Sequence, residues 1–140
     1  MSRLAAFLAG DHVDDIAIVL SDGFVENREA LEGHAESVDG GLALVLPGER
    51  GRAVFERVTG SDPMAFARAA NREGRVDRDL AGGDCPEGDG TSDHHPAILL
   101  AFAESRNEEA GGLYAEGDVI HAYVRCACGT RYSDRWVADA

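Results

Sequence analysis

The stretch 112–136, GLYAEGDVIHAYVRCACGTRYSDRW, decides the fold of the C-terminal half of the chain. It predicts a strand over 119–126, a tight turn, and a second strand over 130–137. The turn holds two of the three cysteines, Cys126 and Cys128. This is the one place in the chain where residue type and spacing indicate chemistry as well as packing.

Upstream of this hairpin, three short apolar runs predict strands that are buried on both faces. They are Ile16–Leu20, Leu42–Leu46 and Ala97–Ala103. The first two flank a helical pattern over 26–38 and predict a βαβ unit. Such a unit is right-handed, and strands buried on both faces are usually parallel.

The remaining segments complete the prediction of the fold. Helices are expected over 3–9, over 51–58 and from Pro63 to about Arg72, with a weak edge strand over 76–80. The segment 81–96 is rich in Gly, Asp, Ser and Pro and is long for a plain loop. The expected architecture is a single domain over 1–140 of the α/β (α+β) class. The βαβ half and the antiparallel C-terminal strands share one sheet, which helices flank.

Charge is the strongest signal in the composition. The formal net charge is −13, and all 13 cationic residues are Arg. Such a charge repels itself in dilute buffer, whereas molar salt reduces the screening length to about 3 Å. Acidic excess without Lys therefore favours the cytosol of a salt-accumulating organism. The alternative is an acidic protein from a GC-rich genome, in which Arg replaces Lys.

The same charge bears on partners and on location. It disfavours nonspecific binding to nucleic acid and to anionic membrane surfaces, because both require a basic surface. The apolar run 4–9 is too short for a signal peptide, and no run reaches the ~18 residues of a membrane span. Three cysteines cannot all pair within the chain, so a reducing cytoplasm is expected.

The cysteines predict a zinc site. Zinc knuckles place thiolates on tight turns beside Gly, and Cys126-Ala127-Cys128-Gly129 has this form. Cys85 lies in a second turn that contains Pro and Gly, and His94 or His95 is the candidate fourth ligand. A structural zinc needs four protein ligands, and such an ion would hold the long loop in place.

Two other hypotheses stay open for the same thiols. The cysteines are either reduced, partly buried side chains without a ligand, or Cys126 and Cys128 form a redox-active dithiol. His121 is a poor ligand candidate, because its position along the strand places it on the face opposite Cys126.

A second candidate site lies where a strand meets a helix N-terminus. Gly48, Arg50, Gly51 and Arg52 occupy this junction, where free amides and guanidinium groups could hold a phosphate-containing ligand. The segment matches neither a Walker motif nor a G-x-G-x-x-G fingerprint. The alternative is a glycine-containing turn whose Arg side chains pair with nearby carboxylates.

Several segments of the chain resemble a small family of acidic haloarchaeal proteins of unknown function. The segments are GGLYAEGDVIHAY (111–123), CACGT (126–130), VDGG (38–41) and PGERGR (47–52). The resemblance implies a cytoplasmic halophile protein and supplies no catalytic residues. We therefore expect a binding or adaptor module with a structural zinc ion and an unidentified protein partner. The alternative is an enzyme or ligand-binding protein that uses the strand–helix junction.

Overall fold

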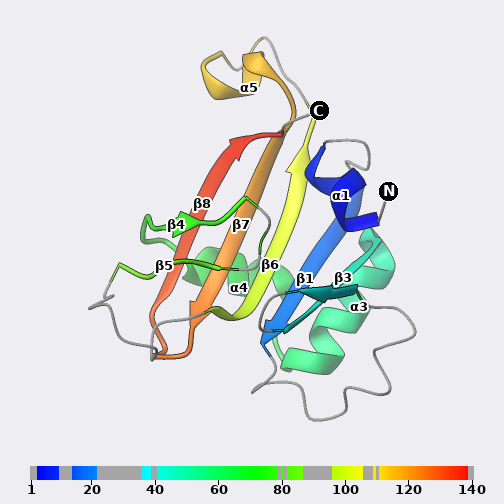
Figure 1. Ribbon diagram of the computed structural model, residues 1–140, viewed down its shortest axis with the longest axis vertical. Coiled ribbons are helices and arrows are strands. Elements are labelled where there is room, and N and C mark those ends of the chain that lie inside the picture. Colours follow the sequence, from blue (N-terminus) through cyan, green and yellow to red (C-terminus); the bar gives the residue numbers. More distant parts are fainter. Residues whose placement is uncertain are drawn as a thin grey trace.

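A computed structural model describes residues 3–9, 14–21, 36–38, 41–78, 80, 82–86, 96–105, 109 and 111–138. Within these residues a six-stranded sheet has the order β2-β3-β1-β6-β7-β8, and β4 and β5 form a separate two-stranded sheet (Figure 1). Every strand pairing is antiparallel. The elements are α1 (Arg3–Leu8), β1 (Asp15–Ser21), β2 (Glu36–Val38), β3 (Gly41–Pro47), α3 (Gly48–Thr59), α4 (Pro63–Ala69), β4 (Arg75–Val76), β5 (Gly83–Asp84), β6 (Pro96–Glu104), α5 (Leu113–Glu116), β7 (Val119–Cys126) and β8 (Arg131–Val137).

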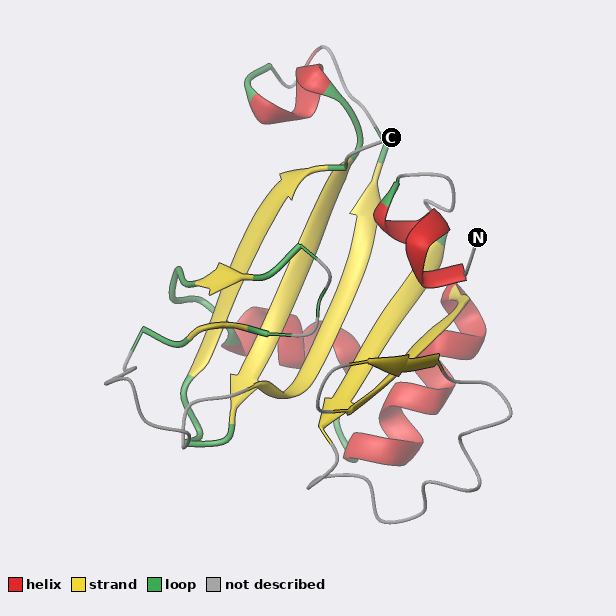
Figure 2. Cartoon of the chain, viewed as in Figure 1, coloured by secondary structure: helices red, strands yellow, loops and turns green. Residues whose placement is uncertain are grey.

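Both faces of the main sheet are covered. Helix α1 and the β4–β5 pair lie over the near face, and α3 and α4 lie behind it (Figure 2). Alternate residues of β1 point into two separate cores, so that Ala17 and Val19 join the near core and Ile16, Ile18 and Leu20 join the far one. Burial of each large aliphatic side chain contributes about 1.5–3 kcal/mol.

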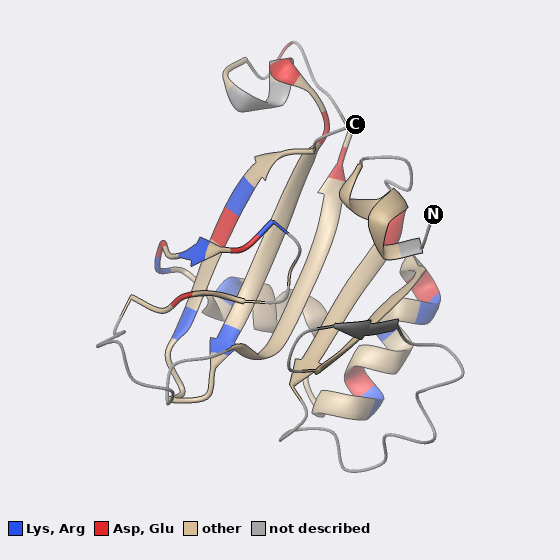
Figure 3. Ribbon diagram, in the orientation of Figure 1, with Lys and Arg blue, Asp and Glu red and all other residues tan. Residues whose placement is uncertain are grey.

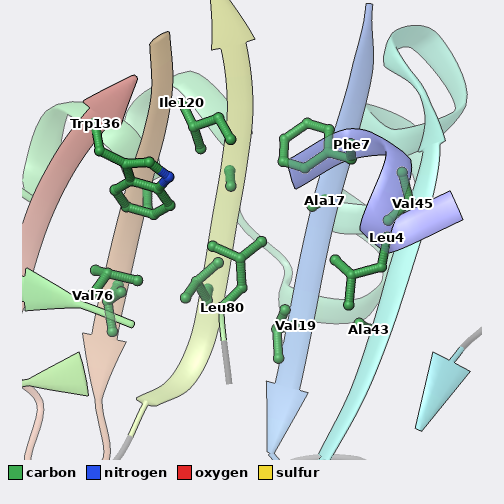
Figure 4. Close-up of a cluster of buried hydrophobic side chains, with 14 of the residues drawn as sticks. Leu4, Phe7, Ala17, Val19, Ala43, Val45, Val76, Leu80, Ile120 and Trp136 are labelled. Carbon is green, nitrogen blue, oxygen red and sulfur yellow. The ribbon is translucent and has the colours of Figure 1, made fainter. Parts of the chain in front are cut away.

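The near core is the one that reaches the cysteines. Leu4 and Phe7 of α1 pack over β1 and β3, while Val76 lies over β7 and Leu80 lies over β6 (Figure 4). Tyr132 and Trp136 belong to this core, as do Cys85 and Cys126. The two aromatic residues of β8 therefore pack between the sheet and the elements that cover it.

The helices behind the sheet follow their sequence signals. The Asp62 carboxylate caps α4 by accepting a hydrogen bond from Ala65 N at 3.0 Å, and Pro63 occupies the first turn. Gly60 ends α3 with a φ of 74°, in the left-handed region that glycine favours. Phe55 of α3 and Phe66 of α4 meet edge to face, with ring centroids 5.2 Å apart. These contacts fix both helices on the sheet.

The mixed α+β class and the shared sheet are confirmed, but the parallel pairing implied by the βαβ unit is wrong. β1 and β3 are antiparallel neighbours, with Ile18 opposite Leu44. The apolar runs reflect two covered faces, and α1, α3 and α4 cover this sheet without parallel crossovers. Of the helix expected over 26–38, residues 26–35 lie outside the described residues, and 36–38 form β2.

The remaining strand predictions are confirmed in kind. β6 includes the predicted 97–103, β7 matches 119–126, and β8 begins one residue after the predicted start. The expected edge strand over 76–80 is reduced to β4 (Arg75–Val76). No helix in the described part of the chain combines the length and apolarity needed to cross a bilayer.

Candidate metal centre

The β7–β8 turn holds two sulfurs at one end of the sheet. Cys126 N donates to Thr130 O at 2.8 Å, and Gly129 N donates to Cys126 O at 2.9 Å, so the turn is closed on both sides. Gly129 has a φ of 94°, a conformation that side chains rarely adopt. The turn leaves the Cys126 side chain buried and the Cys128 side chain exposed.

The third sulfur comes from the β4–β5 pair. Arg75 of β4 pairs with Asp84 of β5, and the guanidinium of Arg75 contacts both Asp84 (2.7 Å) and Asp77 (2.6 Å). Val76 N donates to Asp134 Oδ2 at 3.0 Å, which fastens this pair to β8. Cys85, directly after β5, is thereby held against the cysteine turn.

The three sulfurs meet at distances that suit a metal ion. The Sγ atoms of Cys85, Cys126 and Cys128 all lie within 4.8 Å of one another, and those of Cys85 and Cys128 are 3.8 Å apart. In a tetrahedral zinc site with Zn–S bonds of ~2.3 Å, two sulfurs are about 3.8 Å apart. A disulfide requires about 2.05 Å, and all three cysteines are free. The cluster can hold a thiophilic cation.

The surroundings of the cluster shift the pKa values of two of its thiols in opposite directions. Burial raises the pKa of Cys126 to about 11. The hydrogen bond between the Cys128 sulfur and the Thr130 hydroxyl oxygen, which lie 3.2 Å apart, is the main cause that lowers the pKa of Cys128 to about 6. Metal ions bind thiolates, so Cys128 is already in the form that could bind a metal at neutral pH, whereas Cys126 would first have to release a proton.

Burial also affects a tyrosine beside the sulfurs. Desolvation is the main cause that raises the pKa of Tyr132, and the charges of Cys126 and Cys85 add to it. Tyr132 is fully buried. Its phenol is therefore neutral at physiological pH, and it packs in the same core as Cys85 and Cys126.

The predicted histidines have different outcomes. His94 and His95 lie outside the described residues, so the fourth ligand stays a prediction. His121 faces away from the cysteines, as its strand position predicts. Its Nε2 lies 3.0 Å from Glu104 Oε2, and its ring packs on Phe102.

Thr130 is the contributor that the sequence interpretation missed. It stands two residues after Cys128, where a hairpin returns to its second strand and a hydroxyl can reach back to the thiolate. A hydroxyl residue at this offset from a turn cysteine is the signal that would have indicated it. Its hydrogen bond favours the charged form of the sulfur.

The predicted anion site lies on the far face of the sheet. Gly48 and Arg52 line a cleft of about 350 Å³, but Asp14 and Asp15 line it as well. Gly51 is buried, and a Cβ there would lie 3.0 Å from Ile16 Cβ, so this glycine lets α3 approach β1 closely. Arg50 and Arg52 are exposed. The carboxylates beside the guanidinium group weaken the attraction for an anion.

The comparisons with known proteins give a family and no function. No curated protein and no solved structure matches the chain. A protein family, described as a family of unknown function (DUF5807), matches residues 35–139, a region that contains all three cysteines. The chain belongs to this family of unknown function, DUF5807.

Proposed function

We propose that Cys85, Cys126 and Cys128 hold a structural zinc ion, with His94 or His95 as the fourth ligand. The 3.8 Å separation of the Cys85 and Cys128 sulfurs carries the proposal, because it equals the spacing of two thiolates on tetrahedral zinc. Partial burial supports it too, since Cys85 and Cys126 are shielded from water.

The ion would cross-link two segments that are distant in the sequence. Cys85 belongs to the turn after β5, and the other two thiolates belong to the β7–β8 turn. Bridging them would hold the β4–β5 pair over the near core, where Val76 and Leu80 pack. Metal binding would then contribute directly to the stability of the folded protein.

A zinc ion with four protein ligands has no open position for a substrate. We therefore favour a binding or adaptor module over an enzyme that uses this metal. The composition supports a reducing, salt-rich cytoplasm and disfavours membranes and nonspecific nucleic acid. The salt-rich setting predicts a loss of compactness below roughly 0.5 M salt, measured by small-angle scattering. Unchanged dimensions in dilute buffer would contradict it.

Metal content tests the zinc proposal. Untagged protein purified at high salt should carry one equivalent of zinc, and chelation should lower its unfolding midpoint in urea. Cys126→Ser should lose the metal. Asp84→Asn is the matched control, because it removes the ion pair next to Cys85 but keeps every sulfur. Zinc below about a tenth of an equivalent, with a midpoint indifferent to the chelator, would refute the proposal.

An anionic ligand at Gly48, Arg50, Gly51 and Arg52 is the alternative function, for an enzyme or a ligand-binding protein. The N-terminus of α3 supports it, because helix N-termini attract phosphate. The Asp14 and Asp15 carboxylates in the same cleft count against it. Titration with inorganic phosphate, compared between the wild type and Arg50→Ala plus Arg52→Ala, decides this alternative. Equal binding by both proteins would exclude it.

A further inference from the structure

The face of the β7–β8 hairpin that points away from the cysteine core carries a second concave feature. A cleft of about 490 Å³ lies between the two strands and the segment that follows α4. His121, Tyr123, Ser133 and Arg135 line its sheet side. Its volume falls within the range of small-molecule sites, and its lining is polar.

Strand pairing and ring packing fix the sheet side of this cleft. Arg135 is the cross-strand partner of His121, and Ser133 is the partner of Tyr123, so all four side chains lie on one face. The His121 side chain is only 14% exposed and is held by Glu104. Phe102 supports both rings, with centroids 5.5 Å from His121 and 5.4 Å from Tyr123. This wall is ordered before any ligand binds.

The opposite wall is tied to the same strand by its backbone. Ser133 N donates to Arg72 O at 2.8 Å, and Gly74 N donates to Ser133 O at 3.0 Å. Between these two bonds, Glu73 forms a parallel bridge with Ser133. The exposed side chains of Asn71 and Glu73 are therefore held beside the strand without a closing movement.

The charged groups of the cleft differ in what they can offer a ligand. Both carboxylate oxygens of Asp134 accept from backbone amides, those of Val76 and Arg135. Glu73 places a solvent-accessible carboxylate on one wall, and Arg135 places a guanidinium on the other. Arg135 is two residues from the bridge partner of Glu73, about 7 Å along the strand. Both side chains are long, so a small molecule that carries both charges can contact the two of them at once.

We propose that this cleft binds a small zwitterion of the α-amino acid type. Its carboxylate is held by the Arg135 guanidinium, which suits carboxylates because it can donate two parallel hydrogen bonds. Its ammonium group is held by the Glu73 carboxylate. His121, Tyr123, Ser133 and Asn71 supply polar groups for the rest of the ligand.

Two nearly isosteric probes test the proposal, because L-lactate carries a hydroxyl where L-alanine carries an ammonium group. Amide NMR signals of Gly74, Ser133 and Arg135 report binding, at the lowest salt that keeps the protein folded. L-Alanine should give saturable shifts, with L-lactate at least about tenfold weaker. Arg135→Gln should weaken L-alanine at least about tenfold, and Glu73→Gln should remove its advantage over L-lactate.

Matched variants separate the cleft from general charge effects. Arg50→Ala plus Arg52→Ala removes positive charge elsewhere and should leave the L-alanine shifts unchanged. Arg135→Lys keeps the charge without the paired donors and should bind with intermediate affinity, which covers the case in which Arg135→Gln unfolds. No saturable shift with L-alanine up to roughly 10 mM, or equal affinity for the two probes, would overturn the proposal.

Discussion

The two faces of the β7–β8 hairpin differ in almost every physical property. Cys126 and Tyr123 are three residues apart on β7, yet the cysteine belongs to the dry core under α1 and β4, whereas the tyrosine lines a polar cleft. The near face therefore suits a metal held by thiolates, and the far face suits a water-soluble ligand. The difference follows from the two-residue period of a strand, which sends neighbouring side chains to opposite faces.

The charged residues lie mostly outside the buried core of the sheet. Acidic and basic residues lie on the helices, on the β4–β5 pair, along the edge strand β8 and near the ends of other strands, while the middle of β1, β3 and β6 carries none (Figure 3). Asp15 is the buried charged residue among those that the structure describes. The strong negative charge of the chain is therefore displayed outside an ordinary apolar interior, where added salt can screen it.

Gly74→Ala should give the largest effect, because this residue touches both faces. It lines the far cleft, and a Cβ there would overlap the ring of Tyr132, whose Cγ would lie 2.9 Å away. Overpacking of this kind destabilises by about 1–3 kcal/mol. Urea unfolding should show that loss, and the amide signals of Ser133 should shift. A variant as stable as the wild type would contradict the close packing of loop and core.

The pH dependence of the metal-free protein should carry a contribution from the two cysteines of the β7–β8 turn. The pKa of Cys128 is lowered to about 6, below the ~8.5 of an unfolded cysteine, so its contribution to stability grows from pH 6 to pH 8.5. The pKa of Cys126 is raised to about 11, so its contribution is present below pH 8.5 and is lost towards pH 11.

Unfolding experiments in chelator should therefore give a stability maximum near pH 8.5. Cys128→Ser should remove the rise on the acidic side and keep the decline on the alkaline side. Arg135→Gln, on the far face, should leave the rise intact and serves as the control. A rise that survives in Cys128→Ser would assign it to another group and would break the electrostatic distinction between the two faces.

The pattern of apolar and polar residues in the sequence predicted the features that depend on neighbouring residues, such as the positions of the strands and the faces on which their side chains lie. The apolar runs identified β1, β3 and β6, and strand parity placed His121 away from Cys126. The prediction that β1 and β3 are parallel was wrong. An apolar run shows that both faces of a strand are covered, but it does not show the direction of the neighbouring strand. The proximity of Cys85 to Cys126 was predicted from chemistry, because a zinc site needs several thiolates and the two cysteines lie in separate turns. The structure brings their sulfurs together.

The far cleft could not be predicted in the same way. Its loop wall depends on backbone hydrogen bonds that Arg72 and Gly74 form with Ser133, about sixty residues further along the chain, and these bonds use no distinctive side chain. Backbone pairing of this kind leaves no residue-type signal in a single sequence. Arg135 and Glu73 therefore resembled two ordinary surface charges among many until the fold placed them on facing walls.

X-ray absorption at the zinc K-edge tests the central claim most directly. Protein purified without tags at high salt should show three sulfur scatterers at ~2.3 Å and one nitrogen at ~2.0 Å from the zinc. Cys85→Ser should lower the sulfur count by one or release the ion. A spectrum dominated by oxygen and nitrogen, or zinc with fewer than three sulfur neighbours in the wild type, would contradict the account of Cys85, Cys126 and Cys128 as a metal centre.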